Sequence, residues 1–199
     1  MKKIILPFAL LLSVTLYSQE CSVENVEQFQ HEINEEYANP EESPLKEKDL
    51  KHFKSLDFYS IDMAYCVEAK LVRTPNEKPF LMPTTTSRKP KYIKYGEFHF
   101  TLQGVECKLD VFRNLDLAKL EEFKDHLFLP FTDLTSGNGS YGGGRYIDLK
   151  IPQGDTIYID FNRAYNPYCA YNYDYSCPIP PKQNDLKVEV KAGVKEFNN

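Results

Sequence analysis

Hydrophobic residues recur at every second position through most of this chain, from about residue 57 to residue 192. They do so in short stretches that are rich in β-branched and aromatic residues and are bounded by glycine, proline, asparagine or aspartate, as strands are. Tight turns that join two strands into a hairpin are expected at Gln103-Gly104 and at Gly154-Asp155. Strands that follow one another without long helices between them pair antiparallel. We therefore predict a mainly β fold, an antiparallel sandwich or a small barrel, from the stretches DMAYCVEAKLV, KPFLMPTTT, KYIKYGEFHFTLQG, VECKLDVF, GRYIDLKI, DTIYIDF and LKVEVKAG.

Three segments follow a helical period instead. Residues 22–39 and 43–53 place apolar side chains at steps of three and four, and each begins at a serine that can cap a helix, Ser22 and Ser43. Residues 115–127, LDLAKLEEFKDHL, have a similar pattern between two expected strands. The prediction is therefore two short N-terminal helices that pack on the larger body of the domain, and one helical insertion.

The first residues have the features of a secretory signal peptide. Two lysines are followed by the apolar run IILPFALLLSVTL and then by the small residue Ser18. The run is too short to span a membrane as a helix. We expect cleavage of residues 1–18, which leaves a single domain of residues 19–199 that is periplasmic or secreted. A lipoprotein is not expected, because Glu20 precedes Cys21 where a small residue is needed.

The overall charge limits the partners. The formal net charge is −5, whereas nucleic-acid binding requires a basic surface, so no nucleic-acid partner is expected. No cluster of lysine and arginine indicates an anionic membrane surface, and no membrane span is expected once the signal is removed. The expected partner is a small polar or saccharide ligand, and no cofactor is expected.

The stretch FLPFTDLTSGNGSYGGGRYIDL, residues 128–149, holds five glycines within eight residues. It contains matches to GxGxxG and nearly to GxSxG, but both motifs need a helix directly afterwards, and a strand is expected here. Neither a dinucleotide site nor an esterase elbow is therefore predicted. Two interpretations stay open. The stretch is a tight turn whose polar side chains bind their own backbone, or it is a ligand floor with Arg145 as an anion clamp. A buried Arg145 would need a carboxylate, for which Asp160 is the candidate.

Two long patterns carry a family resemblance. They are FxPFxDxTSGxxxYGGGRYxDL and GDxxxxDFNRAYNPxCAYNxxxxCPxPPxxNxL. The chain resembles the bacterial domain-of-unknown-function family 1684, a family of uncharacterised exported and cytoplasmic proteins, from about Glu24 to Lys195. The resemblance implies no established activity, cofactor or catalytic residue. It implies that the following residues belong to the family pattern: Asp133, Tyr141, Gly143, Gly144, Arg145, Tyr146, Asp160, Asn162, Tyr165, Asn166, Pro167, Cys169, Cys177, Pro178 and Asn184.

The chain has five cysteines. Because this number is odd, at least one of them cannot form a disulfide within the chain. Cys169 and Cys177 lie in one short irregular segment, and an oxidising compartment permits a disulfide between them. A zinc site is the alternative, but the spacing is wide and a second ligand pair is not evident, so no metal is predicted. By strand alternation Cys66 and Cys107 face opposite sides of the sheet, and we predict that both are free thiols.

Three functions from different classes remain. The first is a module that binds a small ligand in a pocket between the glycine-rich loop, residues 137–145, and the Tyr/Pro/Cys segment, residues 165–181. The second is a structural or protein-interaction domain without a pocket. The third is a hydrolase that uses paired carboxylates, although neither pattern contains a histidine, the commonest general base. No catalytic residue is assigned. The candidate ligand-binding residues are Arg145, Tyr146, Asp133, Asp148, Asp160, Asn162, Asn166, Tyr165 and Tyr168.

Overall fold

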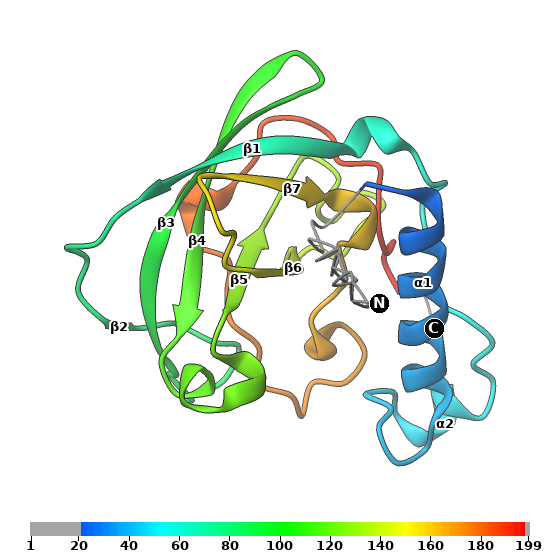
Figure 1. Cartoon of the computed structure of the whole chain (residues 1–199). Helices are drawn as coiled ribbons and strands as arrows, with labels where there is room; N and C mark the ends of the chain where they lie inside the picture. Colours follow the sequence, from blue (N-terminus) through cyan, green and yellow to red (C-terminus); the bar gives the residue numbers. More distant parts are fainter. Residues whose placement is uncertain (1–20, 198–199) are drawn as a thin grey trace, which may run out of the picture.

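The computed structural model describes residues 21–197, so the predicted signal peptide lies outside the described residues. Seven antiparallel strands form one sheet that curls into a half-barrel (Figure 1). The predicted fold class is confirmed, and the sheet is a partly closed barrel. The order across the sheet is β6-β5-β4-β3-β1-β7, and β2 pairs with β3 off this path. The strands are β1 (Cys66–Arg73), β2 (Phe80–Leu81), β3 (Lys91–Leu102), β4 (Val105–Asn114), β5 (His126–Phe131), β6 (Arg145–Lys150) and β7 (Thr156–Asp160).

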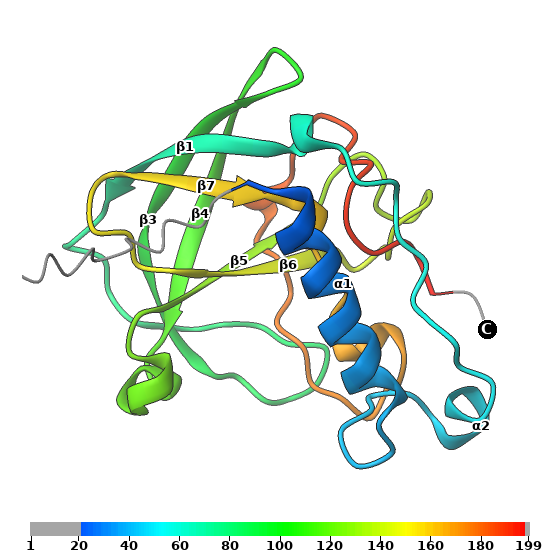
Figure 2. The ribbon, with the colours of Figure 1, turned by 45° about the vertical axis from the view of Figure 1, so that its right-hand side comes forward.

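The two predicted turns have different outcomes. Gln103 and Gly104 join β3 to β4, and both have positive φ angles, 51° and 77°, as a two-residue hairpin requires. The turn at Gly154 joins β6 to β7, but these strands are the two edges of the sheet, and β7 pairs with β1 instead. The predicted hairpin there is wrong. The curl brings the edges close enough for residues 151–155 to cross between them (Figure 2).

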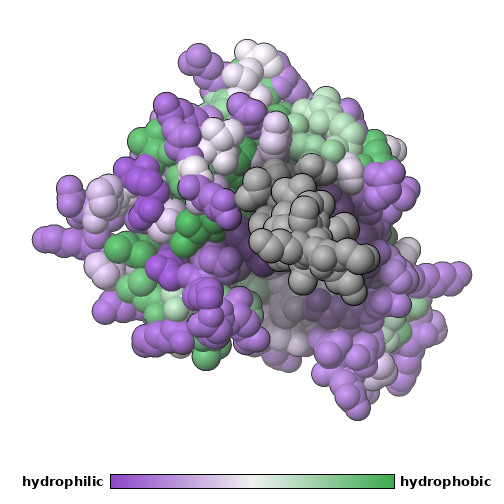
Figure 3. Space-filling view, viewed as in Figure 1, coloured by the Kyte–Doolittle hydropathy of each residue, from purple (hydrophilic) through white to green (hydrophobic). Residues whose placement is uncertain are grey.

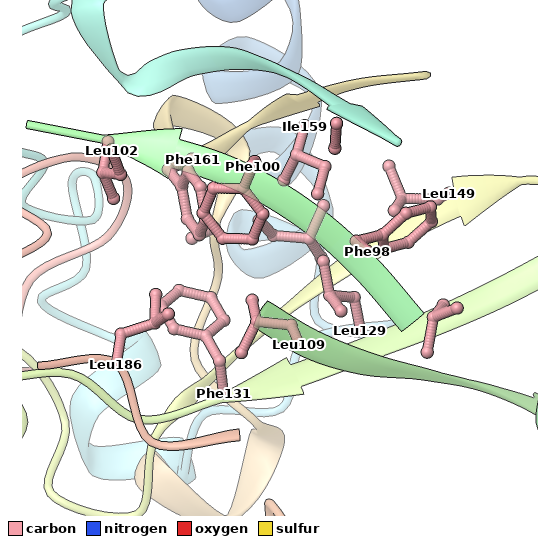
Figure 4. Packing of buried hydrophobic residues seen from close by; sticks show 14 of the residues in the cluster. Phe98, Phe100, Leu102, Leu109, Leu129, Phe131, Leu149, Ile159, Phe161 and Leu186 are labelled. Atoms are coloured by element: carbon pink, nitrogen blue, oxygen red, sulfur yellow. The ribbon is translucent and has the colours of Figure 1, made fainter. Parts of the chain in front are cut away.

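The inside of the curl is filled with apolar side chains. Strand alternation sends Phe98, Phe100 and Leu102 of β3 inward, where they meet side chains from β4, β5 and β7 (Figure 4). Phe100 and Phe131 both contact the ring of Phe161, with ring centroids 5.8 and 5.3 Å from it. The barrel interior is therefore a packed core, and space for a ligand has to lie elsewhere.

The C-terminal stretch, residues 185–194, completes this core without forming a strand. Leu186, Val188, Val190, Ala192 and Val194 are all buried, which is the alternation that predicted a strand. Its backbone does not join a ladder, however. Its partners are the loop after β5, where Leu186 N donates to Thr132 O, and buried charged side chains described below. Alternation therefore predicted which residues are buried here, but the expected strand is wrong.

The helices pack on loops beside the sheet, against residues such as Leu56, Tyr171 and Val194. Helix α1 (Val23–Ala38) begins at Ser22, whose hydroxyl accepts from Asn25 N, as predicted. Helix α2 covers only Glu47–Leu50, and Ser43 does not cap it. The Ser43 hydroxyl donates to Tyr37 O near the end of α1 and accepts from Leu45 N. The insertion 115–127 contains two short 3₁₀ turns. Within residues 21–197, no helix has both the length and the apolar character that crossing a bilayer requires.

The cysteine pairing differs from the prediction. Cys21 is bonded to Cys66, with their Cα atoms 6.0 Å apart, so the expectation that Cys66 is free is wrong. Cys66 is the first residue of β1, and its partner lies just before α1, 45 positions away. Cys107 is free, as predicted. The predicted Cys169–Cys177 disulfide is also wrong, since both thiols are free and the Cys169 N–H donates to the Cys177 sulfur at 3.1 Å.

Candidate functional site

Asp133 and Arg145, on either side of the glycine-rich loop, form a buried ion pair and do not line a ligand site. Arg145 is completely buried, and its guanidinium donates to Asp133 Oδ1 at 3.1 Å. It also donates to the backbone carbonyls of Val190, at 2.8 Å, and Ala192. Asp133 Oδ2 accepts from Val190 N at 2.7 Å. The pair therefore supplies the hydrogen bonds that a neighbouring strand would otherwise give to the C-terminal stretch.

Burial lowers the pKa of Arg145, and the charge of Asp133 opposes this shift.

Asp160, the predicted partner of Arg145, binds a different residue. Its carboxylate accepts from the backbone N and the side-chain Nδ2 of Asn162, at 3.0 and 2.8 Å. The expectation that Asp160 neutralises Arg145 is therefore wrong. Asn162 in turn donates to Asp62 O, and Asn166 donates to Lys195 O, at 2.9 and 2.8 Å. These side chains connect segments of the fold.

A pocket of about 600 Å³ opens on the outer face of the sheet. Alternation places one set of side chains of β5 and β6 in the core and the other set, which includes Phe128, Tyr146 and Asp148, on this face. Helix α1 forms a second wall and the Tyr/Pro/Cys segment a third. Figure 3 shows the molecule from the same side as Figure 1, and the surface visible in this view is mainly hydrophilic.

Four of the candidate residues line this pocket, namely Tyr146, Asp148, Tyr165 and Tyr168. The other five, Asp133, Arg145, Asp160, Asn162 and Asn166, do not. The predicted position is correct for one wall only, because the Tyr/Pro/Cys segment lines the pocket and no residue of the loop 137–145 does. The reason is alternation within β6, which turns Arg145 into the core and Tyr146 outward.

A histidine that the patterns did not contain completes the polar centre of the pocket. His126 Nε2 lies 2.7 Å from Asp148 Oδ1, and the Tyr165 hydroxyl donates to Asp148 Oδ2 at 2.6 Å. In the β5–β6 ladder Phe128 is opposite Asp148, so His126, two residues earlier, is its diagonal neighbour on the same face. The sequence analysis did not indicate this contact, because His126 falls within the predicted helical insertion 115–127, whereas it is the first residue of β5.

The remaining polar groups line the walls. The Tyr168 hydroxyl donates to Glu36 of α1, and the Tyr146 hydroxyl donates to Pro178 O. Arg88 Nη2 donates a hydrogen bond to Ser176 O at 2.7 Å. Burial, followed by the charge of Asp148, raises the pKa of Tyr165 well above its usual value. This phenol therefore stays protonated and acts as a fixed hydrogen-bond donor.

Comparison with known proteins identifies a family, but the description of that family names no activity. A family model described as "Protein of unknown function (DUF1684)" matches residues 51–195. The chain is also similar to the solution NMR structure of the uncharacterized protein from gene locus rrnAC0354 of Haloarcula marismortui, with 32% identity and a TM-score of 0.68. That similarity covers 86% of this chain and 92% of the other. The comparison with curated proteins finds no match. Helix α1, one wall of the pocket, precedes the matched residues.

Proposed function

Because the chain belongs to the DUF1684 family, whose description names no activity, we propose from its pocket that it is an exported module that binds a small, neutral, polyhydroxylated ligand such as a saccharide unit. The observation that carries this proposal is the convergence of Tyr146, Asp148 and Tyr165 on one pocket. These residues come from both long sequence patterns. Tyr146 packs in a second buried cluster on the outer face of the sheet, and all three residues have atoms that line the pocket.

The lining suits a ligand with both apolar and polar faces. Ligand pockets have volumes of about 300–1,000 Å³, with aromatic walls and a few polar groups that fix orientation. Here Tyr92, Phe128, Tyr168 and Tyr175 offer rings, and carboxylates lie among them. Sugar rings present C–H faces that pack on aromatic rings and hydroxyls that donate to carboxylates. The pocket therefore matches this ligand class in size and chemistry.

The charge of the lining favours a neutral ligand over an anion. Glu32, Glu36 and Asp148 contribute three carboxylates, while Arg88 and His126 are the basic side chains of the lining. Like charges at short range repel, so a phosphate or carboxylate ligand would be disfavoured relative to an uncharged one. We therefore expect the pocket to prefer saccharides over sugar phosphates and nucleotides.

Export is part of the proposal and is supported by the Cys21–Cys66 disulfide. Structural disulfides persist in oxidising compartments and are rare in the reducing cytosol. The apolar N-terminal run supplies the corresponding signal. Edman sequencing or intact mass of the secreted protein tests this part, since cleavage after Ser18 predicts a mature chain that begins at Gln19.

An NMR titration tests the binding proposal. Glucose, galactose and N-acetylglucosamine are added to ¹⁵N-labelled protein, with glucose 6-phosphate as the anionic comparison. We expect the neutral sugars to shift the amide signals of residues around Tyr146, Asp148 and Tyr165, and the phosphate to bind more weakly. Absence of shifts with every sugar would contradict the proposal and would favour a purely structural role for these residues.

A matched pair of variants locates the site. Tyr175 lines the pocket, whereas Tyr173, on the same loop, is 82% exposed and does not. Loss of one aromatic stacking contact costs about 1 kcal/mol, roughly a fivefold weaker affinity. We expect Tyr175→Ala to show this loss and Tyr173→Ala to bind as the unaltered protein does. Equal effects of the two substitutions would place the sugar elsewhere.

A further inference from the structure

We propose that this pocket is also hydrolytic, with His126 as a general base that acts on a small carboxylic ester, such as an O-acylated saccharide. The inference rests on the proposed function, because the ester has to be held in the same pocket. It adds a reaction, a catalytic residue and a positioning residue, which binding alone does not need.

The hydrogen bonds around His126 determine which nitrogen can accept a proton. An ionised carboxylate only accepts hydrogen bonds, so the 2.7 Å contact with Asp148 Oδ1 places the proton of the neutral imidazole on Nε2. The lone pair is then on Nδ1. Asp148 is itself held by the Tyr165 hydroxyl at 2.6 Å, and the ring of Phe123 packs edge-on against the imidazole, with centroids 5.9 Å apart. The base is therefore oriented before a substrate arrives.

Two other features of the pocket favour an ester bond over glycosidic and phosphate-ester bonds. Both oxygens of Asp148 are occupied, by His126 and Tyr165, so this carboxylate orients the base and is not available as a second acid for glycosidic cleavage. The carboxylates of Glu32 and Glu36 in the same pocket disfavour phosphate esters. An acyl carbon, in contrast, can be attacked by water with a single general base.

The proposed reaction consumes only water and the ester. His126 Nδ1 takes a proton from a water molecule while the water oxygen forms a bond to the acyl carbon. The C–O bond to the alcohol then breaks, and the departing alkoxide takes the proton from the imidazolium. The products are a carboxylic acid and an alcohol, and His126 returns to its neutral form.

The test uses p-nitrophenyl acetate as the probe ester. His99 provides a matched control, since it also pairs with a carboxylate, Glu97 Oε2 at 3.1 Å, but lies outside the pocket. A general base contributes about 100-fold or more to the rate. We expect kcat/KM to fall by about 100-fold in His126→Gln and to stay unchanged in His99→Gln. Equal rates in the unaltered protein and His126→Gln would overturn the proposal.

Two further measurements separate the possible failures. The ¹⁵N shifts of the His126 ring in the unaltered protein should show a proton on Nε2, and Asp148→Asn should abolish that preference while leaving His99 unchanged. The opposite tautomer would overturn the proposal even if His126→Gln does not fold. If sugars still bind His126→Gln and the probe is not hydrolysed by any form, the hydrolytic inference fails and the binding proposal stands.

Discussion

Single side chains of the two family patterns divide between holding the fold and lining the pocket. Arg145 and Tyr146 are neighbours in β6, yet the first is buried in the core and the second lines the pocket. Asp133 and Asp148 divide in the same way. One sequence pattern therefore contains both residues that hold the fold and residues that line the pocket, because successive side chains of a strand point to opposite faces.

Arg145 should therefore matter for stability and not for binding directly. Removal of one partner of a buried ion pair leaves an uncompensated charge and costs about 3–5 kcal/mol. We expect Arg145→Ala to lower the free energy of unfolding by that amount in urea titrations. Lys187→Ala, which breaks the exposed pair with Asp185, should change it by less than about 1 kcal/mol. Similar small effects in both variants would contradict this account of Arg145.

Glu97 should contribute a pH dependence of stability. Its carboxylate accepts from Lys94, Lys108 and His99, and foremost the hydrogen bond from Lys94 lowers the pKa of Glu97 to about 2. Because this lies below the ordinary value of 4.5, the ionised carboxylate stabilises the fold above pH 4.5. That stabilisation is lost as the pH falls from about 4.5 to 2.

Urea unfolding at a series of pH values checks this expectation. Glu97→Gln should remove part of the acid-induced loss of stability between pH 4.5 and 2.5. Glu189→Gln serves as the control, since Glu189 pairs with Lys191 on the exposed surface. Superimposable pH profiles of the two variants would show that the Lys94 contact does not have this effect.

Secondary-structure elements were predictable where local chemistry determines them. The β3–β4 hairpin follows from Gln103-Gly104, and helix α1 from its apolar stripe and serine cap. The backbone pairing of the C-terminal stretch could not be predicted. Its period-two pattern shows which side chains face the core, but it does not show which backbone groups its N–H and C=O groups bond to. His126 was missed because residues 115–127 were predicted to be helical, whereas His126 begins β5, and because its partner Asp148 lies 22 residues away.

At the scale of the whole molecule, the filled half-barrel leaves the outer face of the sheet for function. The sequence predicted antiparallel strands but not that the sheet would curl until the turn at Gly154 links its two edges. Curl depends on contacts between distant strands, such as Cys66 opposite Asp160. The pairing of Cys66 was mispredicted for a different reason: its partner Cys21 lies 45 positions away, outside the strands whose alternation was considered.

The Cys21–Cys66 disulfide should stabilise the junction between α1 and the sheet. It closes a loop with a sequence separation of 45, for which the chain-entropy estimate is about 4 kcal/mol. We expect Cys66→Ser to unfold at lower urea concentration and to be insensitive to reductant, whereas Cys107→Ser keeps the reductant sensitivity of the unaltered protein. A reductant effect that persists in Cys66→Ser would point to a different disulfide.

We propose that ligands bind in the outer-face pocket and not at the glycine-rich loop. The most direct test is amide chemical-shift mapping during titration with N-acetylglucosamine. We expect the shifts to concentrate around Tyr146, Asp148 and Tyr165 and in the facing wall of α1, and residues 137–143 to be unaffected. Shifts concentrated in residues 137–143, or no saturable shifts at all, would contradict this proposal.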